Sequence, residues 1–460
     1  METSFSWIDT AIIIAYLATL TGIGIYFSKR QKNLDDFFRA GQTMTWLPIG
    51  LSLMAALNSG IDYLMVPSAT MKYGLVLLLG SASWFALYPW VSQVTLPFYR
   101  RLNFYSAYEY LEERFDVRVR SLAAAIFILW RVGWMATAMY VPCLAINAAT
   151  AGKVPLIPMI VLLGGVVTIY TMLGGIKAVI WTDVLQFCIM MAGLTATIVV
   201  VIANVPGGLG EIWHTAQATG KTTLSSPIPG MAQAGFWEAV HLFFLEPVTM
   251  VGILASAVVG RMTVYTSDQV MVQRFQTTRS VKDSRQAFII NAITDAFWMF
   301  GLAFVGMAIL TYFQHHTLSQ DLKPDQIFPS FMSQAFPTGL MGAVIAAILA
   351  ASLSSIDSAI NSCTTVLMTD FYNRYAKHRT IIDERFPHEE QQSQLRLSRW
   401  TTVALGILGT TLACNVGKLG NLLELSSKVI NLLTGSLFGI YLLGMFTKGA
   451  SSRGVLIGGL

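Results

Sequence analysis

Charged residues are scarce in this 460-residue chain. Asp, Glu, Lys and Arg make up only 12% of it, hydrophobic residues make up 54%, and the mean hydropathy is +0.58. A soluble domain carries about 25% charged residues, so this deficit excludes an ordinary soluble domain. Many apolar runs approach or exceed the ~18–20 residues that cross a ~30 Å hydrocarbon core, which predicts an all-α polytopic membrane protein.

Cysteine is also scarce. Its four copies lie in apolar segments without the spacing of metal ligands, at Cys143, Cys188, Cys363 and Cys414. We expect them to be small buried side chains. The N-terminal apolar run lacks a basic flank before it and a small-residue cleavage site after it, so it is predicted to be a retained helix. The net charge of +5 gives no indication of a nucleic-acid partner, and none is expected.

Apolar runs give the order of the predicted membrane spans. A first span at 7–28 precedes a second at 45–72, which Asn58-Ser59-Gly60 interrupts near its middle. A polar segment at 205–235 separates two halves of the chain, and residues 453–460 look like the start of a further helix. The remaining spans are predicted at 74–98, 119–149, 155–173, 177–203, 236–262, 286–312, 338–372, 396–417 and 421–447.

Basic residues are unevenly distributed among the loops. When the spans alternate across a bilayer, the basic clusters fall on one side, and the other side keeps scattered lysines such as Lys153, Lys221 and Lys323. Basic loops stay in the cytoplasm, so the N-terminus is predicted to lie on the outer side of the membrane. The membrane is expected to be a plasma membrane, the bacterial inner membrane, and its lipids are expected to surround the protein. The clusters follow the first span and recur at Arg100/Arg101, Arg114/Arg118/Arg120, Arg274/Arg279/Lys282/Arg285 and Arg374/Lys377/Arg379/Arg385/Arg396/Arg399.

Two interrupted spans suggest an internal repeat. Asn58-Ser59-Gly60 breaks the span at 45–72, and Glu246-Pro247 lies within the span at 236–262. Discontinuous helices at matching places in two halves are typical of inverted-repeat transporters, with the binding site at the breaks. Unwound backbone there frees carbonyl oxygens that bind a cation. The alternative for Glu246-Pro247 is a simple proline kink.

A polar stripe interrupts the apolar span at 338–372. Ala351, Ser354, Ser355 and Ser358 follow the i, i+3, i+4, i+7 pattern of one helix face, and Asp357 lies on the shoulder of that face. Hydroxyl and carboxylate oxygens are hard ligands that suit an alkali cation better than a transition metal. The alternative is that small residues let two helices approach closely, with hydroxyls bonded to their own helix backbone.

Ionisable residues within or beside the spans are functional candidates because burying a charge in a membrane is costly. Each also has a simpler interpretation. Asp183 could satisfy backbone amides near a helix start, Asp268 could lie in solvent beyond a helix end, and Arg131 could pair with an acid on a neighbouring helix. Asp62 and Asp357 are predicted to lie deepest.

Four motifs carry a resemblance to a known family. They are Tyr170-Thr171-Met172-Leu173-Gly174-Gly175-Ile176-Lys177-Ala178-Val179-Ile180-Trp181-Thr182-Asp183-Val184-Leu185-Gln186, Ser106-Ala107-Tyr108-Glu109-Tyr110-Leu111, Val272-Gln273-Arg274-Phe275, and Thr369-Asp370-Phe371-Tyr372. Over essentially its whole length the chain resembles the sodium:solute symporter family, close to the bacterial sialic acid carriers, and Gly174–Gln186 also resembles the iodide and monocarboxylate carriers. The resemblance implies one transporter domain, 1–460, with a LeuT-like fold. It would hold two inverted five-helix repeats, 45–204 and 236–447, behind the extra helix at 7–28.

The resemblance also implies the ion sites. A sodium ion would bind the backbone carbonyls of Ala55, Asn58 and Ala351 and the side chains of Ser354 and Ser355. Some family members hold a second sodium, which here would lie among Asp183, Ser354, Asp357 and Ser358. The sialic acid carriers have serine where Asp357 stands. Two carboxylates at one site raise the pKa of one of them, so Asp357 is expected either to bind the ion more tightly or to carry a proton.

By the same resemblance, the solute pocket would be lined by Leu57, Ser59, Asp62, Leu77, Ser81, Trp134 and Asp268. The sialic acid carriers have at the position of Trp134 an arginine that grips the substrate carboxylate, so the tryptophan argues against sialic acid. Arg131, one turn away, is a candidate for an anion-binding role instead. Asp62 and Asp268 would accept hydrogen bonds from sugar hydroxyls or pair with an ammonium group, and Trp134 would stack on a sugar or a cation.

The expected function is sodium-coupled symport of a small solute by alternating access, with Na⁺ as the coupling ion and a monomer as the working unit. A sugar, polyol or amine-bearing solute is favoured, and the alternative is a monocarboxylate or a sialic-acid-like anion. An enzyme is not expected, because no His/Asp/Ser or metal-ligand constellation faces a shared cavity. A transporter-derived sensor is a further, less favoured alternative; it would need a signalling domain, which would have to lie outside these 460 residues.

Overall fold

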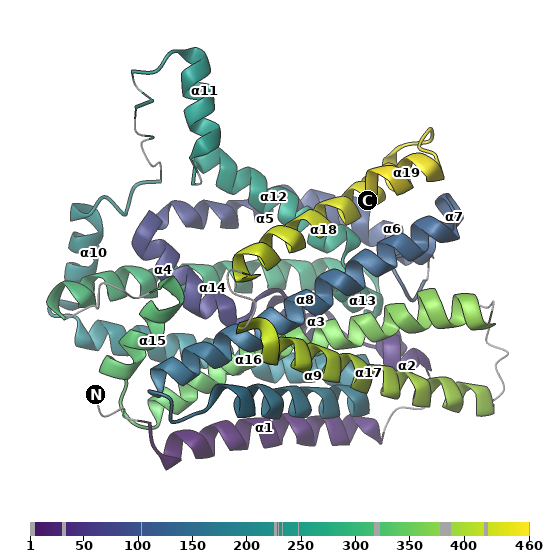
Figure 1. The fold of residues 1–460 in the computed structure, drawn as a ribbon, viewed down its shortest axis with the longest axis horizontal. Coiled ribbons are helices and arrows are strands. Elements are labelled where there is room, and N and C mark those ends of the chain that lie inside the picture. The colour runs from purple at the N-terminus through teal and green to yellow at the C-terminus, as the bar shows by residue number, and fades with distance from the viewer. Residues whose placement is uncertain are drawn as a thin grey trace.

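The computed structural model describes residues 5–29, 34–102, 104–224, 228, 230–231, 233–246, 248–316, 323–377, 388–417 and 422–459. Helices dominate these residues, and Met44 and Thr278 form a single isolated β-bridge among them. Long helices lie side by side along the longest axis of the molecule (Figure 1). Within the described ranges, seven helices are long and apolar enough to cross a membrane, and one bent helix pair makes an eighth candidate.

The first half of the chain follows the predicted spans closely. Its helices are α1 (Trp7–Ser28), α2 (Leu34–Arg39), η1 (Ala40–Gln42), α3 (Trp46–Leu57), α4 (Gly60–Tyr73), η2 (Leu75–Ala82), α5 (Ser83–Trp90), η3 (Val91–Thr95), α6 (Leu96–Leu102), α7 (Glu109–Arg114), α8 (Val117–Ala149), α9 (Leu156–Asn204) and α10 (Gly208–Ala218). The 28 residues from η2 to α6 make one span. The 49 residues of α9 are divided at Gly175, whose φ of 55° and ψ of −164° suit only glycine, so the two predicted spans, 155–173 and 177–203, meet there.

The second half differs from its prediction at the broken span. Its helices are α11 (Phe236–Leu245), α12 (Met250–Ser267), α13 (Gln269–Gln276), α14 (Val281–His315), α15 (Pro324–Ala335), α16 (Leu340–Val366), η4 (Leu367–Lys377), α17 (His388–Val416), α18 (Leu422–Phe446) and α19 (Ser452–Gly459). The span expected at 236–262 is two helices, and α11 has no buried residue and stands clear of the bundle (Figure 1).

The predicted interruption at Glu246-Pro247 falls between α11 and α12, and the structure adds a further break that the sequence did not predict. Glu246 ends α11 in an extended conformation, as the residue before a proline prefers, and Pro247 lies outside the described residues. The membrane span is α12, and its continuation into α13 is interrupted at Asp268, which is extended (φ −88°, ψ 116°). The carboxylate of Asp268 accepts a hydrogen bond from the backbone N–H of Val270 and so caps α13.

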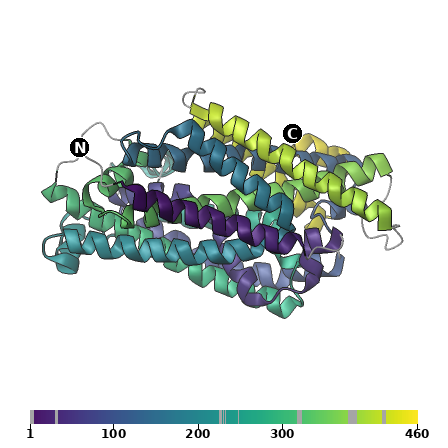
Figure 2. The same ribbon diagram turned by 90° about the horizontal axis from the view of Figure 1, so that it is seen from below.

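Helix α16 forms the centre of the bundle. In its most apolar stretch 94% of the residues are buried, because α16 packs against α9, α8, α1 and α3. Its N-terminus is capped from α1: the Asp9 carboxylate accepts backbone hydrogen bonds from Gly339 at 2.8 Å and Gly342 at 2.6 Å. Helix α1 lies along one edge of the molecule in Figure 1 and in front of the bundle in Figure 2. The N-terminal helix is therefore joined to the start of α16.

Basic loops meet at the opposite end of α16. Arg374, near the end of η4, pairs with Glu112 at 2.7 Å, and Arg114 donates to the carbonyl of Thr447 at 2.6 Å. Arg100 donates to the carbonyls of Thr278 and Arg279. The described basic clusters thus gather at the end away from Asp9, as the alternation of spans predicts. Four basic residues of the predicted clusters, Arg30, Lys32, Arg379 and Arg385, lie outside the described residues.

Candidate sodium and solute sites

The first broken helix places backbone oxygens at the middle of the bundle. α3 and α4 are bent by 64°, and Asn58 and Ser59 between them are extended. The Ser59 hydroxyl accepts from the N–H of Ile61 at 3.2 Å, and the Asp62 carboxylate accepts from the N–H of Ser59 at 2.6 Å. This capping box satisfies the start of α4. Ser59 and Asp62, expected in the solute pocket, are thus engaged in capping and do not line the cavity described below.

The five oxygens predicted for sodium lie together. The Ser354 hydroxyl donates to the carbonyls of Ala55 at 2.8 Å and Ala351 at 3.0 Å. The Ser355 hydroxyl lies 2.9 Å from the Asn58 carbonyl and 3.4 Å from that of Ala351. All five residues are buried. The cluster holds only carbonyl and hydroxyl oxygens, the hard donors that suit an alkali cation.

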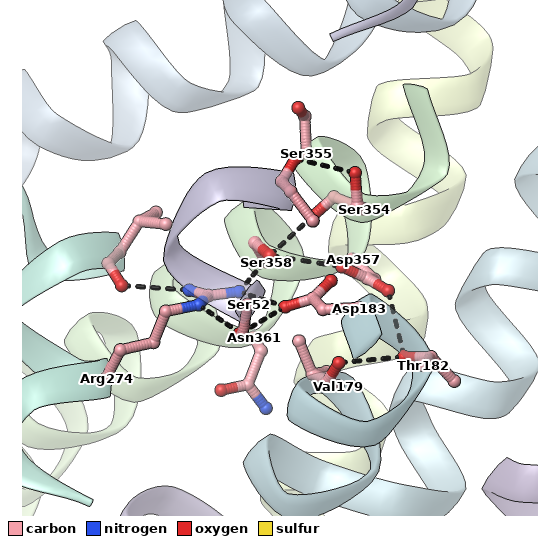
Figure 3. Close-up of polar contacts among 12 residues, drawn as sticks. Ser52, Val179, Thr182, Asp183, Arg274, Ser354, Ser355, Asp357, Ser358 and Asn361 are labelled. Carbon is pink, nitrogen blue, oxygen red and sulfur yellow. Dashed lines mark hydrogen bonds and ion pairs between the residues drawn. The ribbon is translucent and has the colours of Figure 1, made fainter. Parts of the chain in front are cut away.

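A buried charged cluster lies one turn further along α16 (Figure 3). Arg274 of α13 pairs with Asp183 of α9 at 2.8 Å, and both side chains are fully buried. The Ser52 hydroxyl of α3 donates to Asp183 at 2.5 Å and accepts from the Arg274 Nε at 2.8 Å. The prediction named Asp183 but missed Arg274 and Ser52. Arg274 stands in one of the quoted family motifs, which was the available signal.

Asp357 is also held by hydrogen bonds in this cluster. It accepts from the Tyr170 hydroxyl at 2.7 Å and lies 3.1 Å from the Ser358 hydroxyl and 3.5 Å from that of Thr182. The Ser358 hydroxyl donates to the Ser354 carbonyl at 2.5 Å and accepts a hydrogen bond from the Arg274 guanidinium. The structure therefore brings the four predicted residues of the second site together, with a guanidinium among them.

A cavity of about 280 Å³ lies beside the sodium cluster. It contains three of the predicted solute residues, Leu57, Arg131 and Trp134. The Arg131 guanidinium pairs with Asp268 through Nε and Nη2 and lies 4.4 Å from the ring centre of Trp130. The lining that the sequence did not predict comes from several helices and comprises Ala56, Trp130, Gly260, Thr263, Val264, Met271 and Thr434.

Two predicted solute residues lie elsewhere. Leu77 and Ser81 belong to the 3₁₀ helix η2, which packs against α12, and neither lines the cavity. Asp268 does not line the cavity itself but holds Arg131 at its wall, so its predicted solute contact becomes an ion pair with the protein. The prediction assumed an α-helix at these residues. A 3₁₀ helix has three residues per turn instead of about 3.6, so different side chains face the inside of the bundle.

Comparison with known proteins gives the family of the chain. The model of the sodium:solute symporter family matches residues 37–460. The chain belongs to the sodium:solute symporter family. The sodium/sialic acid symporter SiaT of Proteus mirabilis is 31% identical over 458 residues, which cover 99% of this chain and 88% of that protein. The human sodium-coupled monocarboxylate transporter 1 is 28% identical, over 98% of this chain and 71% of that protein.

A solved structure supports the same fold. A sodium-coupled sialic acid symporter in a substrate-bound, outward-open state matches with a TM-score of 0.86 and 29% identity, over 98% of this chain and 89% of that one. The chain therefore has the LeuT-like fold and is a multi-pass membrane transporter. It is a sodium-coupled symporter of a small solute, and its named relatives are transporters, not enzymes.

Proposed function

We propose that the chain imports a small organic carboxylate together with sodium. The expected preference for a sugar, polyol or amine is not supported, because the named relatives are symporters of sialic acid or monocarboxylates. The observation that carries the proposal is Arg131, a buried guanidinium that lines the cavity beside Trp134. The planar N–H fork of a guanidinium matches the geometry of a carboxylate.

The geometry of Arg131 fits this role. Its ion pair with Asp268 uses Nε and Nη2, which leaves Nη1 for a carboxylate oxygen of the solute. Asp268 fixes the guanidinium, so little side-chain entropy is lost on binding. Trp134 stands where the sialic acid carriers have the arginine that grips their substrate, which favours a smaller monocarboxylate over sialic acid. Leu57 supplies an apolar wall for the rest of the solute.

The proposed sodium ligands are the carbonyls of Ala55, Asn58 and Ala351 and the hydroxyls of Ser354 and Ser355. The two hydroxyls donate to these carbonyls in the structure, and rotating them presents their lone pairs to the ion. Sodium would join α3 to α16 next to the cavity. One sodium and one carboxylate add no net charge to the bundle, which supports positive coupling between them of about 1–3 kcal/mol.

A second cation is proposed between Asp183 and Asp357, with Ser354 and Ser358 nearby. These two buried carboxylates are matched by one guanidinium, Arg274, so with both carboxylates ionised the cluster would carry one uncompensated negative charge. The Oδ1 atom of Asp183 is buried without a hydrogen-bond partner. Sodium or a proton at this place would neutralise the cluster. The number of sodium ions and protons transported per solute distinguishes a bound sodium from a bound proton.

We place the N-terminus outside and the basic end in the cytoplasm of a bacterial inner membrane. The first inverted repeat would run from α3 to α9, close to the expected 45–204, and the second from α12 to α18, starting later than the expected 236. Rocking of α3–α6 and α12–α14 against α8, α9, α16 and α17, within a monomer surrounded by lipid, would expose the cavity to each side in turn.

Uptake into proteoliposomes tests the proposal. Labelled pyruvate, lactate, propionate and sialic acid are compared with lactamide and glucose, under inward sodium or potassium gradients. We expect sodium-dependent uptake of at least one monocarboxylate and none of the matched amide. Uptake of glucose or lactamide, or equal uptake with potassium, would overturn it. Reversal potentials at several sodium concentrations and pH values then give the number and kind of cations.

A further inference from the structure

A further buried acid, Asp295, was assigned to none of the sites described above. It stands in the middle of α14, with a side chain that is 2% exposed. Three donors from three other helical segments converge on it: the Asn58 side-chain amide at 3.0 Å, the Trp84 indole at 2.9 Å and the Arg261 guanidinium at 3.0 Å. Asp295 therefore joins the α3–α4 break, α5 and α12 to α14.

The charge of this cluster is balanced within the protein. Arg261 neutralises Asp295, donates to the Gly80 carbonyl at 2.6 Å and lies 4.4 Å from the ring centre of Trp84. Both carboxylate oxygens accept hydrogen bonds, Oδ1 from Asn58 and Oδ2 from Trp84 and Arg261. This acid thus needs no ion of its own, unlike the pair Asp183 and Asp357.

Asn58 connects this cluster to the sodium site. Its side-chain amide donates to Asp295 and to the carbonyl of Met54 at 3.1 Å, while its own backbone carbonyl lies 2.9 Å from the Ser355 hydroxyl. The residue is extended and lies between two helix ends, so the helix does not fix its carbonyl. The direction of that carbonyl therefore depends on where the side chain is held.

Arg261 connects the cluster to the wall of the solute cavity. It lies on α12 within the same turn as Gly260, Thr263 and Val264, which line the cavity. A shift of α12 on solute binding would act on Asp295 through the Arg261 guanidinium, and on the Asn58 carbonyl through Asp295.

We propose that Asp295, held by Arg261, is a positioning residue that aims the Asn58 carbonyl at sodium and links α12 to the sodium site. The proposal rests on the proposed sodium ligands. The Asp295 carboxylate itself would contact neither sodium nor solute. It would join the α3–α4 break, α5, α12 and α14, which would move as one body.

Sodium-induced thermal stabilisation of the purified full-length chain tests the proposal. Sodium chloride is titrated against potassium chloride at constant ionic strength, and the sodium concentration at half-maximal stabilisation is measured. In Asn58→Ala the backbone carbonyl stays, and the side-chain hydrogen bonds to Asp295 and to the Met54 carbonyl are lost. We expect this concentration to rise about tenfold or more, as for loss of a hydrogen bond to a charged group. Asp295→Asn and Arg261→Gln should shift it in the same direction.

The controls separate positioning from general stability. Asp283→Asn changes an acid at the start of the same helix, which contacts Ser280 and not the cluster, and should leave the sodium midpoint unchanged. The double variant Arg261→Gln/Asp295→Asn removes both charges, so it avoids an unpaired buried ion and keeps the test open where a single variant fails to fold. A variant that melts at a lower temperature in potassium chloride but keeps the sodium midpoint has lost general stability and not sodium positioning.

The outcomes are distinct. Unchanged sodium midpoints in Asn58→Ala and in the double variant would overturn the positioning role of Asp295. If the unmodified protein gains no stability from sodium over potassium, the proposed sodium ligands fail instead, before any variant is considered. A raised midpoint in Asn58→Ala with a normal midpoint in Arg261→Gln would retain the sodium site and reject the link to α12.

Discussion

Arg274 donates to the carboxylate of Asp183 at 2.8 Å, and both side chains are fully buried between α13 and α9. The contact joins the second broken helix to the helix that carries the family motif. It also places a fixed positive charge where a second cation was expected. Asp357, held by Tyr170 nearby, has no guanidinium of its own among the described residues. Two carboxylates and one guanidinium therefore lie close together at the centre of the bundle.

Arg274→Gln should destabilise the protein strongly, because it leaves two buried carboxylates without a guanidinium. Removing one partner of a buried pair costs about 3–5 kcal/mol. Adding Asp183→Asn to Arg274→Gln should recover part of this loss, since one uncompensated charge is removed. Thermal unfolding in detergent, with and without sodium, measures both variants. Wild-type stability of Arg274→Gln would contradict this account of the cluster.

Ser355→Ala should weaken sodium activation of uptake. The variant loses one of the five proposed ligand oxygens, and we expect the sodium concentration for half-maximal uptake to rise about tenfold, or about 1.4 kcal/mol. Ser352→Ala is the matched control, because Ser352 lies on the same helix and its hydroxyl donates only to the Ile348 carbonyl of its own helix. Equal sodium dependence of the two variants would contradict the placement of the ion.

Arg131→Lys should raise the KM for the carboxylate by about tenfold or more, because lysine keeps the charge but loses the planar fork that holds Asp268 and a carboxylate together. Arg131→Gln should abolish saturable uptake. Competition between the acid and its amide provides the readout. A variant that discriminates acid from amide as well as the unmodified protein does would exclude Arg131 from solute recognition.

Glu109, outside the spans in α7, should make stability depend on pH. Burial raises the pKa of this carboxyl from 4.5 to about 7, although Arg120 and the backbone N–H groups of Ser106 and Tyr105 act in the opposite direction. The folded protein thus binds a proton more tightly than the unfolded chain, and stability falls as pH rises from about 4.5 to about 7. Above pH 7 this contribution is constant.

Glu109→Gln should remove that slope. The amide oxygen keeps the two backbone hydrogen bonds without a charge, so the variant should gain stability relative to the unmodified protein as pH rises through this window. Melting temperatures between pH 4.5 and 8 measure the difference. Parallel curves for the two proteins would show that Glu109 does not titrate in this range.

The sequence alone predicted the membrane class and most spans, because hydrocarbon thickness sets helix length and excludes charge. The spans expected at 7–28 and 119–149 lie close to α1 (Trp7–Ser28) and α8 (Val117–Ala149). Helical periodicity also placed Ser354 and Ser355 on one face. Their partners Ala55 and Asn58 came from resemblance, since periodicity identifies a face but not the helix that it meets.

Tertiary structure alone decided which charges pair. Asp183 meets Arg274, Asp268 meets Arg131, and Asp295 meets Arg261, in each case between different helices. Asp295 and Arg261 carried a readable signal as charges inside spans, yet nothing local specified their partner. The break at Asp268 was not predicted either, because its partner Arg131 lies on another helix. The sequence determined where polar groups interrupt apolar helices, and the packing of those helices decided which interruptions meet, because buried charges are stable only beside their counterparts.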